Sequence, residues 1–234
     1  MDIIENVKMK IAERYKTFNR RHRLEYEDNS ALSFFLEYDC KNILDVGCGH
    51  NRFNKVAQKK GIDGIGIDFN KQNLKKNKDN HCLKLLVGDA RLLPFKDESF
   101  NGVHCSHLIE HMLSVDAHKL LYELGRITKI GGILIIRTPV MWKWFYDDFT
   151  HIKPYYPNPI IRYMCHYGGQ RTMQEFDFNF ELVKLIWRYL PLIYAKNPPL
   201  FMKPILRVFD WLYKFHIHSW KKDAYMLVLR RVKI

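Results

Sequence analysis

An apolar run that ends in an acid and two glycines constrains this chain more than any other stretch. Residues 43–49 read Ile-Leu-Asp-Val-Gly-Cys-Gly. The run is typical of a buried parallel strand, and glycines directly after it let the backbone turn tightly and approach a ligand closely. Because residues 50–60 can form a helix, the ligand would lie at a strand end and a helix N-terminus. The stretch therefore predicts a nucleotide-like ligand.

Two interpretations of this turn compete. The dinucleotide-binding fingerprint needs a third glycine where the helix packs on the strand. Counting from Gly47, that position holds Arg52, whose side chain would obstruct the packing, so we expect no NAD or FAD site. Residues 45–49 instead resemble motif I of the class I S-adenosylmethionine (SAM)-dependent methyltransferases. Many members carry a further glycine where this chain has Asn51, and asparagine is the next most tolerant residue of left-handed backbone geometry. The alternative is an ordinary strand–turn–helix unit.

Two further acids follow apolar runs. Asp68 ends a short strand over residues 61–68, about twenty residues after the second glycine, where nucleotide-binding sheets use an acid to accept hydrogen bonds from ribose hydroxyls. A third run, over residues 83–87, is closed by Gly-Asp-Ala. The resemblance implies that Asp89 holds the adenine amino group and that Ala90 lies beside the ring.

The resemblance continues to residue 140. A Leu-Pro-Phe segment and the acidic stretch after it are similar to the family's "lPf.d.sFD" pattern, with Asn101 in place of the usual Asp. A later Gly-Gly pair is similar to the family's "R.LkpGG.l" pattern. The elements expected here are a strand over 103–106, a helix over 120–130 and a strand over 133–136. Residues 41–140 thus match the family in order and without gaps.

Apolar runs that alternate with helical stretches predict an α/β fold. We expect a Rossmann-like, doubly wound, seven-stranded and mostly parallel sheet with an antiparallel last strand and helices on both faces. The stretch 224–232 alternates as a strand and is expected to pair antiparallel with one near 173–180. The expected parts are an N-terminal helical cap (1–40), a SAM-binding core (41–140), an aromatic and Pro-rich active-site lid (141–171), and the last two strands (172–234) with a basic aromatic helical insertion at 181–222.

The resemblance implies S-adenosyl-L-methionine as the cofactor. Ligands of parallel sheets bind at the carboxyl ends of the strands, and several candidate residues fall at such ends. The predicted cofactor-binding residues are Asp45, Gly47, Cys48, Gly49, Asp68, Phe69, Asp89, Ala90, Ser106 and His107. We expect Cys48 to be a small packing residue and not a nucleophile.

A His-x-x-Glu-His pattern offers a different chemistry. His107, Glu110 and His111 match the pattern of inverted zinc proteases, and His104 lies nearby. The segment follows the fourth predicted strand, where it instead resembles the family's "H.lEH" stretch. We therefore predict no metal site, and we expect His107 and Glu110 to line the cofactor and the pocket floor. Proton transfer by this pair is the alternative.

The segment after the fifth strand is rich in aromatic residues and prolines. It includes an Asp-x-Thr-His-x-x-Pro sequence similar to one in many methyltransferases of this type, including some that act on glycans and lipid-linked intermediates. His151 could deprotonate a substrate hydroxyl, with Asp148 orienting it, because imidazole titrates near neutrality. The predicted catalytic residues are thus His151, Asp148 and His107. Alternatively, Asp148 and His151 only tie the loop down through side-chain–backbone bonds.

The insertion at 181–222 is the most basic part of the chain, which carries a formal charge of +13. Two helical pieces are expected, separated by prolines. In the second piece, Lys203, Arg207 and Lys214 form a narrow basic stripe beside a wide apolar and aromatic face. This pattern is typical of a helix at a membrane interface; the alternative is a helix buried against the sheet with its lysines reaching solvent.

Composition narrows the setting. Residues 1–10 lack the apolar core of a signal peptide, and no apolar run is long enough for a membrane span. Five cysteines without a Cys-x-x-Cys pair fit a reduced cytoplasm. The insertion at 181–222 adds an expected contact at the membrane periphery. The predicted function is SAM-dependent O-methylation of a hydroxyl or carboxyl on a sugar, lipid-linked or isoprenoid molecule near a membrane. The alternatives are an RNA methyltransferase, which the pI near 9.5 permits, and a catalytically silent SAM-fold binding protein.

Overall fold

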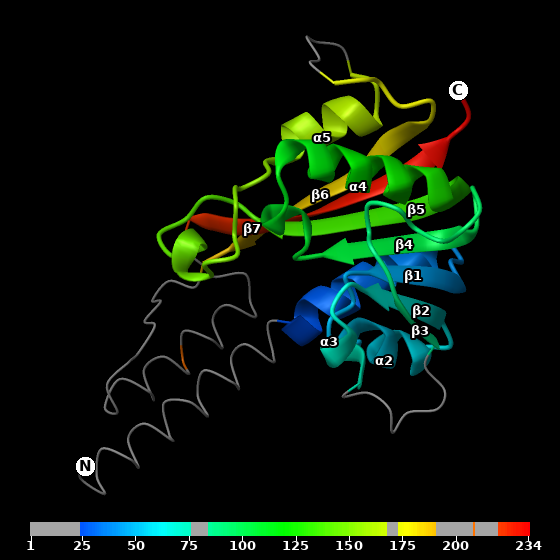
Figure 1. Ribbon diagram of the computed structural model, residues 1–234, viewed down its shortest axis with the longest axis horizontal. Helices are drawn as coiled ribbons and strands as arrows, with labels where there is room; N and C mark the ends of the chain where they lie inside the picture. The colour runs from blue at the N-terminus through cyan, green and yellow to red at the C-terminus, as the bar shows by residue number, and fades with distance from the viewer. Residues whose placement is uncertain (1–23, 76–83, 168–172, 191–207, 209–219) are drawn as a thin grey trace, which may run out of the picture.

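The computed structural model describes residues 24–75, 84–167, 173–190, 208 and 220–234. These residues build one seven-stranded sheet in the order β3-β2-β1-β4-β5-β7-β6, shown in Figure 1. The first five strands are parallel, whereas β7 runs antiparallel to both its neighbours. The strands are β1 (Asn42–Val46), β2 (Asp63–Asp68), β3 (Lys84–Val87), β4 (Phe100–Ser106), β5 (Thr128–Pro139), β6 (Asn179–Tyr189) and β7 (Lys222–Val232). The expected fold class is confirmed.

Helices cover both faces of the sheet, and each face has its own apolar core. One core packs the helix at 24–37 and α2 (Arg52–Gln58) against the strands, through residues such as Phe35 and Phe53. The other core packs α4 (Ser114–Ile127) and α5 (Pro157–Met164) on the opposite face. The short helix α3 (Lys71–Lys75) follows β2 near the β3 edge. The strand ends that carry the predicted site lie between these two layers.

Two predicted elements have different bounds in the structure. The helix expected over 120–130 begins six residues earlier, at Ser114, and ends at Ile127. Its C-terminal end is set by Thr128, whose backbone is extended (φ −75°, ψ 127°) and starts β5. The strand expected over 133–136 is correspondingly longer, because β7 pairs with it from Ile133 to Pro139.

The first helical piece predicted within 181–222 is wrong, because residues 179–189 form β6. The antiparallel strand expected at 224–232 is confirmed as β7, but its partner is β6 and not a strand at 173–180. Glu181 lies opposite Arg230, and Trp187 lies opposite Tyr225. The two rings of the latter pair lie 5.7 Å apart between centroids. Cross-strand packing of this kind decides the conformation of an aromatic and β-branched segment. The second predicted helix lies outside the described residues, except Val208, which is helical and exposed.

A buried network of charges joins the helix at 24–37 to three strands. Glu27 Oε1 accepts from Arg188 of β6 (2.8 Å), and Arg188 also donates to Asp223 of β7 (2.9 Å). Arg137 of β5 donates to Glu27 and, at 3.0 Å, to Asp28. Arg188 belongs to the basic insertion expected at 181–222, but in the structure its charge is paired inside the fold.

Among the residues that the structure describes, no helix has the length and apolar character to cross a bilayer.

Candidate active site

The turn after β1 has the backbone geometry expected of a ligand-binding loop. Gly47 (φ 72°), Gly49 (φ 52°) and Asn51 (φ 52°) all adopt left-handed conformations, so the asparagine performs the role expected of it. The amides of Gly47 and Cys48 both donate to the carbonyl of Ile67, which fastens the turn to β2. A side chain on Gly49 would meet nothing within 4 Å, so the turn is open on that side.

Asp68 lies directly beside this opening. Its Oδ2 accepts from the Gly49 amide at 2.8 Å, and its Oδ1 accepts from the Asn70 amide at 2.7 Å. Each carboxylate oxygen keeps a further lone pair, which suits ribose hydroxyls. The next residue, Phe69, is 82% exposed and offers an aromatic ring at the same strand end. The turn, the acid and the ring together fit the nucleoside part of SAM.

Asp45 lies beneath the turn and not on its open side. It is buried, and its Oδ1 is 2.7 Å from Nδ1 of the equally buried His104. The His104 ring stacks on Phe53 of α2, with centroids 3.8 Å apart. Asp45 thus anchors strands β1 and β4 and helix α2; its direct contact with the cofactor stays a prediction.

Arg52 occupies the position that excluded a dinucleotide fingerprint. Its guanidinium pairs with both oxygens of Asp28 on the helix at 24–37. Helix α2 can therefore begin at Arg52 without pressing this side chain onto β1. The same contact attaches the N-terminal helix to the base of the turn.

Asp89 follows β3 and is held by a neighbour that the sequence analysis did not single out. The amide and Nε of Arg91 donate to its Oδ1 at 2.9 and 3.0 Å, and Arg91 also pairs with Asp116 at 3.1 Å. The hydrogen bond from Arg91 lowers the pKa of Asp89, so this carboxylate is a charged acceptor at neutral pH. Ala90 is nearly buried in the core. Contact of both residues with adenine stays a prediction.

The end of β4 presents Ser106 and His107 at the same edge of the sheet. His107 has a left-handed backbone (φ 55°), uncommon for this residue type, and its amide donates to the Arg137 carbonyl at 2.9 Å. The following residue, Leu108, packs directly over Gly47. A Cβ atom placed on this glycine would lie only 3.1 Å from the Leu108 side chain. His107 is thus placed next to the cofactor turn.

Glu110 holds the imidazole of His107. The two groups meet at 3.1 Å between Nδ1 and Oε1, and the other carboxylate oxygen accepts from Thr138 Oγ1 at 3.0 Å. Burial alone would raise the pKa of Glu110, but the hydrogen bond and charge of His107 outweigh it and lower this pKa below its ordinary value. Thr138 was missed by the sequence analysis, because nothing local marks a threonine inside a buried strand as a partner of Glu110.

The aromatic segment after β5 packs against the same turn. It contains the 3-10 helix η2 (Phe145–Asp147) and is tied to Glu110, whose carbonyl accepts from the Ile152 amide at 2.8 Å. His151 Nδ1 is 2.6 Å from the Phe145 carbonyl. Asp148 Oδ1 accepts from the amide and hydroxyl of Thr150.

Asp148 does not hydrogen-bond to His151 in this arrangement. The shortest contact, from Asp148 Oδ2 to His151 Nε2, is 4.0 Å. The imidazole is oriented by the Phe145 carbonyl instead, so the side-chain–backbone bonds expected under the loop-fastening interpretation are present. A catalytic role of Asp148 and His151 stays a prediction.

The structure does not form the helix that the zinc-protease pattern requires. Residues 109–111 make only one 3-10 turn, η1 (Ile109–His111). His107 faces Glu110, and His104 lies on β4 against Asp45. The Cys48 thiol is not activated as a nucleophile. Burial and the nearby charges of Asp45 and Asp68 raise the pKa of this thiol well above its ordinary value, which supports its packing role.

Comparisons with known proteins agree with this geometry. Residues 44–136 match the family described as Methyltransferase domain. A demethylmenaquinone methyltransferase of Staphylococcus saprophyticus is 28% identical over 181 residues, which cover 72% of each chain. A SAM-dependent methyltransferase structure from Archaeoglobus fulgidus (24% identity, TM-score 0.57) covers 92% of this chain and 98% of its own. A structure from Galdieria sulphuraria, described as a putative sarcosine dimethylglycine methyltransferase, has 14% identity and a TM-score of 0.60 and covers 91% of this chain and 88% of its own. At these identities the structures show the fold alone.

The matched domain and the open glycine turn with its acid define an enzyme class. The protein is a SAM-dependent methyltransferase of class I, and its cofactor is S-adenosyl-L-methionine.

Proposed function

We propose that this enzyme methylates an oxygen, in a hydroxyl or carboxyl group, of an isoprenoid or lipid-linked acceptor near a membrane surface. The observation that carries the proposal is the His107–Glu110 pair beside the cofactor turn. An oxygen nucleophile with a high pKa must lose its proton as it attacks, so a site for such acceptors needs a base within reach of the methyl group.

The pair has the geometry of an oriented base. The Glu110 carboxylate is charged and buried, so His107 donates its Nδ1–H to it and keeps Nε2 as the proton acceptor. The His107 side chain is about one-third exposed and can be reached by a substrate. Thr138 holds the second carboxylate oxygen, which limits rotation of the whole unit. Glu110 is thus a positioning residue, and His107 is the proposed catalytic residue.

The other residues of the site would bind the cofactor and enclose the acceptor. When bound, SAM supplies a sulfonium with an electrophilic methyl group and a built-in leaving group. Asp68 would hold the ribose hydroxyls, and Asp89 would accept from the adenine amino group. The open side of Gly49 leaves room for the cofactor. The aromatic segment, fastened to Glu110 through the Ile152 amide, would shield the acceptor from water. Alignment of nucleophile, methyl carbon and sulfur is the main requirement of this chemistry.

The acceptor class rests on the relatives and on the charge of the chain. Several relatives are named demethylmenaquinone methyltransferases, and the acceptor in that name is an isoprenoid quinone. The name supports the class of acceptor and not the acceptor atom, because the methyl group of a menaquinone is bonded to a ring carbon. An acceptor of this kind resides in a membrane, and a net charge of +13 favours approach to an anionic lipid surface.

The decisive variant is His107→Ala. We expect kcat to fall about 10²–10⁴-fold, and the acidic limb of the pH–rate profile that belongs to the base to disappear. Turnover is measured with radiolabelled SAM and a panel of isoprenoid and polyprenyl-linked hydroxyl acceptors. Calorimetry with S-adenosylhomocysteine is run in parallel, so that a loss of cofactor binding is distinguished from a loss of the base.

Two controls frame this experiment. Glu110→Gln should lower kcat less than His107→Ala, because the amide still fixes the ring without stabilising its positive charge. His118→Gln alters another histidine, one on α4 whose ring contacts the Gln174 carbonyl and none of the site residues, and should leave turnover unchanged. Wild-type kcat in His107→Ala would refute the proposed base.

A further inference from the structure

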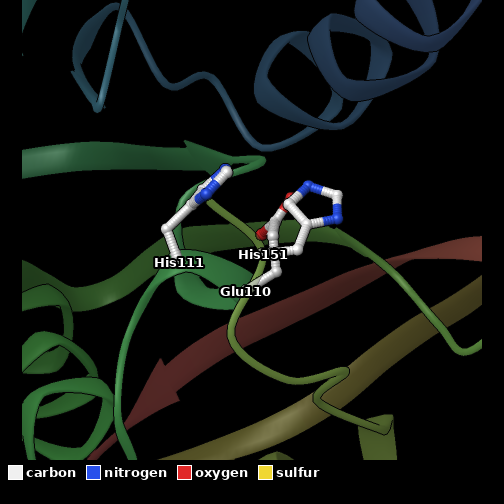
Figure 2. Close-up of side chains that lie close together, drawn as sticks. All are labelled: Glu110, His111 and His151. Atoms are coloured by element: carbon white, nitrogen blue, oxygen red, sulfur yellow. The ribbon is translucent and has the colours of Figure 1, made fainter. Parts of the chain in front are cut away.

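A second cluster of chemically active groups lies beside this pair. Glu110, His111 and His151 each place one possible ligand atom within 4.8 Å of the others. Figure 2 shows the three side chains gathered together, two from the turn after β4 and one from the aromatic segment. The two imidazole rings meet edge to face, with centroids 4.8 Å apart. Forty residues separate the two parts of the cluster, so it exists only in the folded chain.

Both imidazoles have their Nδ1 atoms engaged by backbone carbonyls. His111 Nδ1 is 3.1 Å from the Thr150 carbonyl, and His151 Nδ1 is 2.6 Å from the Phe145 carbonyl. A carbonyl oxygen can only accept, so each Nδ1 carries the hydrogen, and each neutral ring keeps a bare Nε2. The Thr150 hydroxyl donates to Asp148 and therefore accepts from His111 as well.

This is the arrangement that surrounds metal-binding histidines. Such ligands regularly donate their second ring N–H to a carbonyl or carboxylate, which fixes the tautomer and the ring orientation. The Glu110 carbonyl already holds the aromatic segment in place by accepting from the Ile152 amide. Two histidines with separate carbonyl partners are more than the attachment of this segment requires.

Negative charge is available at the same place. Glu110 is buried, and its carboxylate, which meets His107 at one oxygen and accepts from Thr138 at the other, keeps a lowered pKa and therefore a negative charge. Asp148 adds a second carboxylate, with its Oδ2 4.0 Å from His151 Nε2. A dication here would be balanced by one buried carboxylate and one at the rim.

We propose that His111, His151 and Glu110 form a binding site for one divalent first-row transition-metal ion, with Asp148 or an acceptor oxygen completing the coordination. Two imidazoles and one carboxylate suit zinc, cobalt or iron(II), whereas magnesium and calcium prefer all-oxygen sites. This site differs from the His-x-x-Glu-His arrangement of zinc proteases, because His151 and not His107 supplies the second nitrogen.

The role of the ion, but not its binding, rests on the proposed function. A metal beside the acceptor would bind its hydroxyl oxygen and promote loss of the proton. The proton passes to His107 Nε2, the oxygen takes the methyl group, and S-adenosylhomocysteine leaves with the electron pair of the broken carbon–sulfur bond. Charge and atoms balance without any further reactant.

The test uses full-length protein expressed without a polyhistidine tag and stripped with a chelator. Titration with Co²⁺ should give one site per chain and the strong visible absorption of a four- or five-coordinate ion, and Zn²⁺ should displace it. His111→Ala and His151→Ala should each weaken Co²⁺ binding by about 10²-fold or more. The His118→Gln variant is the matched control and should bind like the wild type, while S-adenosylhomocysteine binding reports that each variant is folded.

The outcomes separate this site from the proposed base. His107→Ala should keep the cobalt spectrum while losing turnover. If wild-type protein takes up no Co²⁺ or Zn²⁺, or takes it up equally in the His111→Ala/His151→Ala double variant, the metal site is overturned. In that case a kinetic effect of His107→Ala would still support the base, and the two histidines would be assigned to loop packing.

Discussion

At the scale of single residues, the positions that matter most are those where a backbone conformation and a side chain serve the same turn. Asn51 shows this. Its left-handed backbone replaces a glycine, and its side-chain carbonyl accepts from Asn54 at 2.7 Å inside the structure. A glycine would adopt the conformation but could not make this bond, so the departure from the family's usual pattern adds a local anchor for α2.

The Asp68 carboxylate is expected to contribute most of the ribose recognition. Asp68→Ala should weaken SAM binding by about 1.5–3 kcal/mol, because it removes charge-assisted hydrogen bonds and the acceptor of the Gly49 amide. Isothermal calorimetry measures the effect. Asp63→Ala, at the opposite end of β2, removes an exposed pair with Lys84 and should leave the affinity unchanged. Equal affinities for both variants would contradict the role of Asp68.

At the scale of elements, the central question is what fastens the N-terminal helix to the sheet. Residues 24–37 contribute apolar side chains to one core, and their charged residues also pair with two strands. Glu27 and Asp28 receive Arg137 and Arg188, so β5, β6 and this helix share one network. Arg52 extends the network to the start of α2. The cofactor turn is therefore mechanically connected to the helix.

Glu27→Gln is expected to destabilise the fold by about 3 kcal/mol, because it leaves two largely buried guanidinium groups short of a charged partner. Chemical denaturation at pH 7 measures this. Glu37→Gln, an exposed change on the same helix, is the control and should change stability by no more than about 0.5 kcal/mol.

The buried Glu27 carboxylate should also make the free energy of unfolding depend on pH. Burial would raise the pKa of Glu27, but the charges of Arg188 and Arg137 outweigh it and place this pKa well below its ordinary value. A lowered pKa in the folded state gives stability that is complete above the unfolded pKa and is lost as the pH falls through the acidic range. The acid-side slope of the unfolding free energy should therefore be shallower in Glu27→Gln. An unchanged slope would show that other carboxylates dominate it.

At the scale of the whole molecule, the distribution of positive charge bears on the predicted contact with a membrane. Arg188 is neutralised inside the fold, whereas Lys221 and Lys222 lie on the exposed edge at the start of β7. The insertion at 181–222 holds eight lysines and arginines. Four of them, Lys196, Lys203, Arg207 and Lys214, lie outside the described residues. Their membrane role remains a prediction from the sequence.

Vesicle binding tests that prediction. The protein should co-sediment with anionic vesicles at low salt, bind neutral ones poorly, and be released by salt, since each cation near the surface adds about 1 kcal/mol. Replacing Lys203, Arg207 and Lys214 with Glu should abolish the binding and preserve SAM affinity. The matched triple change uses three exposed lysines elsewhere, Lys59, Lys60 and Lys96, and should retain most of the binding. Wild-type protein that ignores anionic vesicles would refute the membrane role.

The sequence by itself determined the sheet of the core and the class of the cofactor. The reason is that these features depend on local patterns: an apolar run, two glycines and an acid at a set distance along the chain. Gly47, Gly49 and Asp68 meet in space because parallel strands bring their carboxyl ends to one edge, which makes them predictable.

Tertiary structure alone decided the rest. Residues 181–189 became a strand because their partner, β7, lies more than thirty residues later, and no local pattern contains that pairing. Arg188 became internal for the same reason. Likewise, the contacts of Glu110 with Thr138 and the approach of His111 to His151 depend on how the aromatic segment folds back over the turn after β4. Chemistry that requires groups from distant parts of the chain is visible only once packing has brought them together.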